Sequence, residues 1–122
     1  AMVTMKAFWN DCGQGPTSES PVDVSLEQAQ LLWSDGRGVE GNFLGLVDEL
    51  GNTIQFYFNA GIPDDIEDAR HLRIILLDFP VSEKQGSYSK LVTIGEVDEL
   101  IAMAFRIGAR YQSFSGLRFD AW

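Results

Sequence analysis

Apolar residues recur with helical spacing in a short segment that follows Ser25. Ser25 and Gln28 have the spacing of a capping box, in which the hydroxyl accepts from the third helical N–H and the glutamine reaches back to the cap. One face of the segment is apolar and consists of Leu26, Ala29, Leu32 and Trp33. This pattern predicts a helix over 26–33.

A second and longer helix is predicted near the end of the chain. Thr93 and Glu96 form another capping-box pattern, and Gly108 marks the point where the helical pattern ends. The apolar positions between them follow the spacing of one helical face: Val97, Leu100, Ile101, Ala104 and Phe105. We expect a helix over 95–107 that packs through this face.

Alternation of apolar and polar residues predicts a first strand and a hairpin. Residues 2–9 alternate with the period of a strand. Residues 43–47 and 53–59 flank a turn in which Gly51 suits the left-handed position after a type I turn. In the second hairpin strand, Ile54, Phe56 and Phe58 share one face. This segment is the clearest half-buried strand in the chain.

Three more strands are predicted after the hairpin. Residues 72–79 are nearly all apolar, as in a central strand that is covered on both faces, and Pro80 is expected to close it. Residues 88–92 are expected to pair back on this strand, and 117–122 to add an edge strand. The predicted order is therefore β-α-β-β-β-β-α-(β).

This order predicts an α+β fold with a mainly antiparallel sheet and two helices packed on one face. The chain has 122 residues, so we expect one globular domain over 2–122. Ala1 before Met2 resembles the remnant of a cleaved tag and is set aside.

Acidic residues outnumber basic ones by eighteen to nine, which gives a formal charge of −9. Such a chain is expected to repel nucleic acid and anionic membranes and to attract a basic protein partner. The alternative is that the charge only keeps the protein soluble.

The sequence has no apolar run long enough to span a membrane and no signal-peptide pattern at its start. Its single cysteine, Cys12, cannot form an intramolecular disulfide. These features favour the cytoplasm as the location.

Motifs of catalysis and metal binding are missing from the sequence. Cys12 and His71 are the only residues of their kinds, and no local motif pairs them, so an inert thiol and a solvated histidine are expected. Two such ligands are too few for zinc. The Gly-rich segment 35–41 follows a predicted helix and precedes a strand, the reverse of a phosphate loop, and indicates a turn. We expect no enzyme activity, cofactor or metal.

One exposed segment concentrates negative charge, and we expect it to bind the partner. It contains Asp64, Asp65, Glu67 and Asp68, and Glu83 from the loop 82–88 is a further candidate. The alternatives are structural: Pro63 and the acids also suit the first turn of a short helix, and 82–88 suits a hairpin connection.

Two segments, GNFLGLVDELGNTIQF (41–56) and LLDFPVSEKQGSYSKLV (76–92), resemble stretches of small bacterial immunity proteins. Proteins of that group neutralise secreted or polymorphic toxins. The resemblance implies an inhibitor that blocks the active site of a basic toxin, and an acidic surface would speed the encounter. No site residue carries over from it. The alternative is a binding or structural module that forms homo-oligomers or holds a small ligand.

Overall fold

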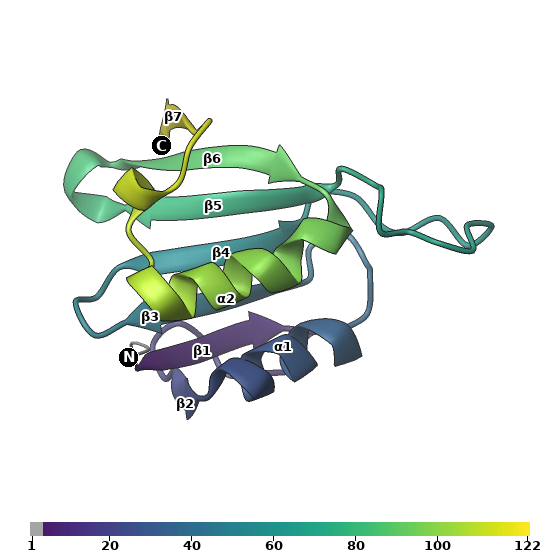
Figure 1. The fold of residues 1–122 in the computed structure, drawn as a ribbon, viewed down its shortest axis with the longest axis horizontal. Coiled ribbons are helices and arrows are strands. Elements are labelled where there is room, and N and C mark those ends of the chain that lie inside the picture. Colours follow the sequence, from purple (N-terminus) through teal and green to yellow (C-terminus); the bar gives the residue numbers. More distant parts are fainter. Residues whose placement is uncertain (1–3) are drawn as a thin grey trace.

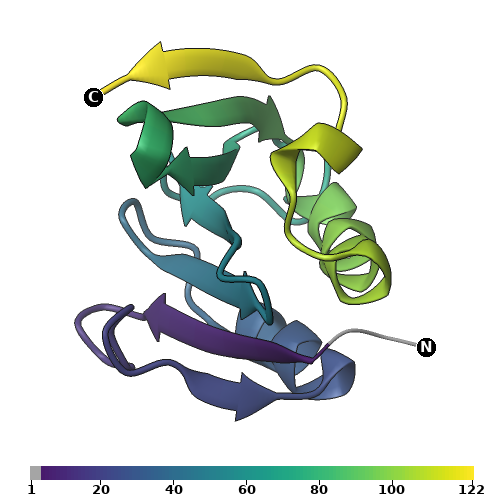
Figure 2. The same ribbon diagram turned by 90° about the vertical axis from the view of Figure 1, so that its left-hand side faces the viewer.

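Seven strands form one antiparallel sheet, and two helices cover one of its faces (Figures 1 and 2). The computed structural model describes residues 4–122. The strands are β1 (Met5–Asn10), β2 (Val22–Val24), β3 (Phe43–Asp48), β4 (Thr53–Phe58), β5 (Ile75–Val81), β6 (Gly86–Val92) and β7 (Arg118–Ala121), and the α-helices are α1 (Leu26–Asp35) and α2 (Val97–Ile107). The predicted α+β architecture, with both helices on one face, is confirmed.

The strand order is β2-β1-β3-β4-β5-β6-β7, and every neighbouring pair is antiparallel. The chain turns back from β1 into β2, passes over β1 in α1, and re-enters the sheet as β3 on the other side of β1. The whole segment between β1 and β3 therefore lies at one edge of the sheet, at the bottom of Figure 1.

The core lies between the sheet and the helices. Alternate strand residues point toward α1 and α2 and are buried: Met5, Ala7, Leu44, Leu46, Ile54, Phe56, Phe58, Ile75, Leu77 and Phe79. From α2, Val97, Ile101, Ala104 and Phe105 fill the other side, as the helical spacing predicted, while Leu100 is only half-buried. On α1, Trp33 stacks on Phe58 with ring centroids 5.1 Å apart.

Both predicted capping boxes are confirmed. The Gln28 N–H donates to the Ser25 hydroxyl at 3.1 Å, and α1 continues two residues further than predicted, to Asp35. Thr93 caps a 3-10 turn, Ile94–Glu96, and α2 starts only after that turn. The hairpin of β3 and β4 is confirmed as well, with Gly51 at a φ of 85°.

The prediction for β5 was wrong in three respects. The strand begins at Ile75 rather than residue 72, and it continues past Pro80 to Val81. Pro80 still pairs with Ser87 of β6, whereas pairing with β4 stops at Asp78. Because proline has no N–H to donate, pairing with β4 ends before Pro80, whereas pairing with β6 continues through it. Only one face of β5 is covered, since Leu76 and Asp78 point to the side without helices and are half-buried.

The three-residue strand β2 was not predicted, because its sequence, Val-Asp-Val, is too short to show a period. The remaining strands were shifted by one or two residues. The first predicted strand includes Met2 and Val3, which lie outside the described residues, as does Ala1; β1 itself runs to Asn10.

The helix-free face of the sheet carries apolar residues of its own. Phe8 is only 3% exposed there, because its ring lies over Gly45, its neighbour on β3. Cross-strand pairing also aligns one row of apolar side chains across four strands: Phe43, Tyr57, Leu76 and Leu91. We call this row the open-face stripe.

Candidate functional site: an acidic edge and its groove

The four acidic residues predicted as a patch lie in the long connection between β4 and β5. Asp64, Asp65, Glu67 and Asp68 are all exposed. The connection extends away from the sheet, at the right of Figure 1. It contains turns and no helix, so the alternative of a first helical turn after Pro63 was wrong.

The Asp68 carboxylate forms an ion pair within this connection. Its two carboxylate oxygens accept from Arg70 Nε and Nη2 at 3.1 and 2.9 Å, a bidentate pair. The guanidinium holds the pKa of the Asp68 carboxyl well below its usual range, and the carboxylate raises the pKa of Arg70. Asp68 therefore offers a partner less net charge than its position in the sequence suggested.

Glu83 does not join the patch. It lies in the 3-10 turn Ser82–Lys84 that links β5 to β6, whereas Asp64 and its neighbours precede β5. Seven strand residues separate the two segments, a span of roughly 23 Å at about 3.3 Å per residue. The two are at opposite ends of the sheet, so one small contact cannot include both.

A second concentration of negative charge lies on β2, α1 and the loops that flank them. Residues 10–42 contain six acidic residues and one basic residue, Arg37, which is paired with Asp11 at 3.2 Å. The other five acids are exposed, and none has a cation of residues 4–122 within ion-pair distance. These five, which we call the acidic edge, are Glu19, Asp23, Glu27, Asp35 and Glu40.

The opposite edge of the molecule is balanced. Residues 82–122, which form β6 and β7 at this edge and the helix α2 across the middle of the sheet, contain five acidic and five basic residues (Figure 1). The net charge of the protein is therefore unevenly spread: residues 10–42 and 43–81 each carry a net charge of −5, and residues 82–122 carry none. The strand order places β2 and α1 of this segment together at one edge of the sheet.

The predicted patch adjoins the acidic edge at one point. The Ile62 N–H donates to the Gly38 carbonyl at 2.8 Å, and the Ile62 side chain occupies the space where a Cβ of Gly38 would lie. This contact fixes the start of the β4–β5 connection beside the linker between α1 and β3. Glu40 therefore lies beside the start of the connection that carries Asp64 and Asp65.

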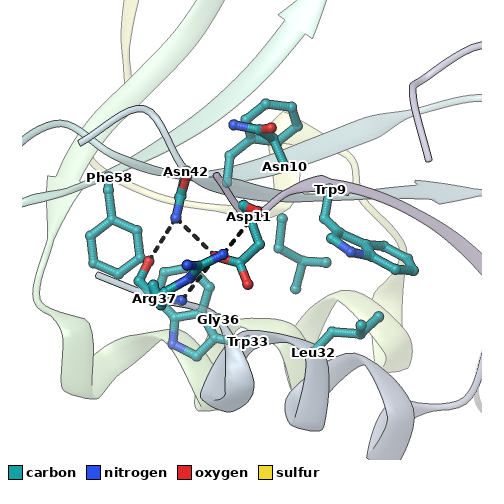
Figure 3. Close-up of a pocket in the computed structure, with 11 residues that line it drawn as sticks. Trp9, Asn10, Asp11, Leu32, Trp33, Gly36, Arg37, Asn42 and Phe58 are labelled. Atoms are coloured by element: carbon teal, nitrogen blue, oxygen red, sulfur yellow. Dashed lines mark hydrogen bonds and ion pairs between the residues drawn. The ribbon is translucent and has the colours of Figure 1, made fainter. Parts of the chain in front are cut away.

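A hydrogen-bonded junction shapes the end of the acidic edge (Figure 3). Asn42 is 5% exposed, and its Nδ2 donates to Asp11 Oδ1 at 3.1 Å and to the Arg37 carbonyl at 3.0 Å. Its Oδ1 accepts from the Cys12 N–H at 2.9 Å. The Arg37 guanidinium donates to Asp11 from the other side. Asn42 therefore joins the turn after β1 to the linker that follows α1.

The cavity at this junction is too small for a ligand. Its volume is about 20 Å³, and its walls include Trp9, Trp33 and Phe58. A space of this size holds one water molecule. The polar groups around it already bond to one another, so the junction acts as a rigid support.

A larger, open groove runs between β2 and α1. Its volume is about 320 Å³, and it is lined by Trp9, Val22, Asp23, Val24, Gln28, Leu31, Leu32 and Asp35. Two of the apolar lining residues are unusually exposed, Val22 at 42% and Leu31 at 52%. Two members of the acidic edge, Asp23 and Asp35, also line it. The sequence pattern did not predict this groove, because Leu31 lies outside the apolar face that was assigned to the helix.

One further cluster combines charge with aromatic rings. Lys84 Nζ lies 2.9 Å from the Tyr88 hydroxyl, and the rings of Tyr88 and Tyr111 stack 4.0 Å apart. These hydroxyls raise the pKa of Lys84, and the ammonium group lowers the pKa of Tyr88. A polar pocket of about 260 Å³ borders Lys84 and Tyr111. We assign the cluster to the packing of β6 against the segment after α2.

The surroundings of Asp48, Cys12 and His71 indicate no catalytic or metal-binding role. Asp48 is buried and accepts from the N–H groups of Leu50, Asn52 and Ala109, which connects the hairpin turn to the end of α2. Cys12 and His71 are exposed in separate loops. Within residues 4–122, no three His, Cys, Asp or Glu side chains are placed to hold a metal ion.

Comparisons with protein families, with curated proteins and with solved structures found no match to this chain. Neither described helix has the length and apolar character that crossing a bilayer requires.

Proposed function

We propose that this protein binds a basic protein partner through its acidic edge. One observation carries the proposal: five exposed acids without ion-pair partners lie on β2, α1 and the loops that flank them, while residues 82–122 have equal numbers of acids and bases. A charge needed only for solubility has no reason to be distributed so unevenly. An uneven charge orients an approaching basic protein and speeds its association.

The resemblance of 41–56 and 76–92 to immunity proteins suggests the purpose of such binding. We propose that the partner is a toxin with a basic active site, and that the acidic edge covers that site. An inhibitor of this kind needs a rigid scaffold and a negative surface. The junction around Asn42 supplies rigidity at the end of the acidic edge.

A second candidate function is self-association through the open-face stripe. Phe43 and Tyr57 stack with centroids 6.4 Å apart, and Leu91 remains 42% exposed. Apolar rows on an uncovered sheet face are typical of surfaces that meet another protein. Sedimentation of the purified protein distinguishes the candidates, because this function requires a dimer in the absence of any partner.

The proposed function is tested by co-producing the chain with each protein encoded beside it in its genome. We expect one basic neighbour to be toxic alone, to become harmless with this chain, and to co-purify with it as a stable complex. If no basic neighbour binds, or if a toxic neighbour binds and retains full toxicity, the proposal is wrong.

A further inference from the structure

The groove between β2 and α1 combines a free strand edge with an apolar wall. β2 pairs with β1 on one side, and no other strand of the described chain pairs with its second side. Backbone N–H and C=O groups on that free side can pair with another extended chain. The edge strand is short, so it offers pairing for a few residues only.

Side chains from both elements point toward this free edge. Val22 and Val24 pair with Ala7 and Met5, whose side chains are buried beneath the helices, so they project to the helix side of the sheet. On α1, the lining residues Gln28, Leu31, Leu32 and Asp35 follow the i, i+3, i+4, i+7 spacing of one helical stripe. Leu31 and Val22 thus leave apolar surface open on the two sides of the groove.

We infer that this groove binds an extended basic segment of the partner, which pairs with β2 as an added strand. An apolar side chain of the segment lies between Val22 and Leu31 on the helix side, and its alternate Lys or Arg residues, on the helix-free side, approach Asp23. This mode of recognition takes affinity from main-chain hydrogen bonds and specificity from alternate side chains. The inference rests on the proposed function and deepens it by naming the contact.

The negative charge around the groove favours a basic segment as its occupant over a second copy of this chain. Pairing of β2 with β2 of another copy would bring two acidic edges together; among the described residues, the cations nearby are Lys6, opposite Asp23 on β1, and Arg37, which is already paired with Asp11. Like charges placed together across an interface cost free energy. A basic segment is instead attracted by every residue of the acidic edge.

The first test uses a blocked peptide of alternating lysine and valine, seven residues long, as the probe. Amide shifts in NMR titrations should move at 22–24 and along 28–35, with saturation. An equivalent peptide of glutamate and valine serves as the control and should move none of them. Shifts spread over all acidic surfaces, or confined to the open-face stripe, would overturn the inference.

Leu31→Glu separates apolar contact from simple charge attraction. The change adds one negative charge, so attraction by charge alone predicts tighter binding of the peptide. An apolar contact predicts binding about tenfold weaker, a loss of about 1.4 kcal/mol. The matched control is Leu91→Glu, which alters a leucine of similar exposure, 42% against 52%, away from the groove. Tighter binding to Leu31→Glu, or a larger loss with Leu91→Glu, contradicts the inference.

Strand addition is tested with two peptides that are N-methylated at alternate residues in opposite phases. One phase blocks the donors that face β2 and should weaken binding about tenfold. The other phase blocks donors that face solvent and should have little effect. Equal affinities for the two peptides would show that no backbone pairing occurs.

The complex with the basic neighbour distinguishes this inference from the proposed function. If the neighbour binds and Leu31→Glu leaves its affinity unchanged, the groove is not the contact, although the proposed function stands. If no neighbour binds while the peptide occupies the groove as described, the proposed function fails and the groove remains a peptide site.

Discussion

Asn42 Nδ2 lies 3.1 Å from Asp11 Oδ1, and this hydrogen bond ties the turn after β1 to the residue that precedes β3. Asn42→Ala removes the bond and also leaves the Cys12 N–H without its acceptor. We expect a loss of about 1–3 kcal/mol in the free energy of unfolding. Urea unfolding measures it, with Asn59→Ala, at an exposed position, as the control. Equal effects of the two changes would contradict a structural role for the junction.

The packing of α2 predicts a contrast between two truncations. Phe105 is 2% exposed, whereas Leu76 lies half-buried on the open face. Phe105→Ala should cost about 3–5 kcal/mol, because it removes a buried ring and leaves a cavity. Leu76→Ala should cost less, since water can fill the space. Thermal or urea unfolding that ranks Leu76→Ala as the more damaging change would show that the open face is covered.

The Phe8 ring leaves no room for a side chain at position 45, so that position requires glycine. A Cβ at Gly45 would lie 2.2 Å from Phe8 Cζ, so Gly45→Ala must displace that ring. Overpacking of this kind costs about 1–3 kcal/mol. The double variant Phe8→Ala, Gly45→Ala should be more stable than the sum of the single changes predicts, because the clash is gone. Additive losses in urea unfolding would mean that Phe8 does not restrict this position.

Asp78 predicts a pH dependence of stability. Burial raises the pKa of its carboxyl, and a hydrogen bond with Ser87 opposes this shift. A carboxyl with a raised pKa in the folded state favours folding when protonated, so its contribution is complete below the unfolded pKa of about 3.9 and is lost as pH rises. Asp78→Asn should therefore gain stability relative to the parent between about pH 4 and 7. A stability difference that is flat or reversed in urea unfolding over this range contradicts the assignment.

The sequence was sufficient for those parts of the fold that depend on local patterns. Both capping boxes, the buried face of α2 and the hairpin around Gly51 follow from residues a few positions apart. The limits of β5 were not predictable in this way. Pro80 can stay in a strand only because pairing with β4 ends at Asp78, and that is a property of the assembled sheet.

The candidate site depended even more on tertiary structure. The acidic run from Asp64 was conspicuous in the sequence, yet Arg70 neutralises part of it and Glu83 lies at the other end of the sheet. The acids of the acidic edge are spread over 19–40 and were not recognised as a group. They share a surface because α1 passes over β1 and leaves β2 outermost.

The association rate with the basic neighbour tests the central claim most directly. One variant changes Glu19, Asp23, Glu27 and Asp35 of the acidic edge to amides; the matched control changes Glu83, Asp98, Glu99 and Asp120. Each removes four negative charges from exposed residues. Stopped-flow mixing at low ionic strength should show association slowed about tenfold for the acidic-edge variant and little changed for the control, with salt slowing the parent to a similar rate. Equal slowing by both variants, or no slowing by either, would contradict recognition through the acidic edge.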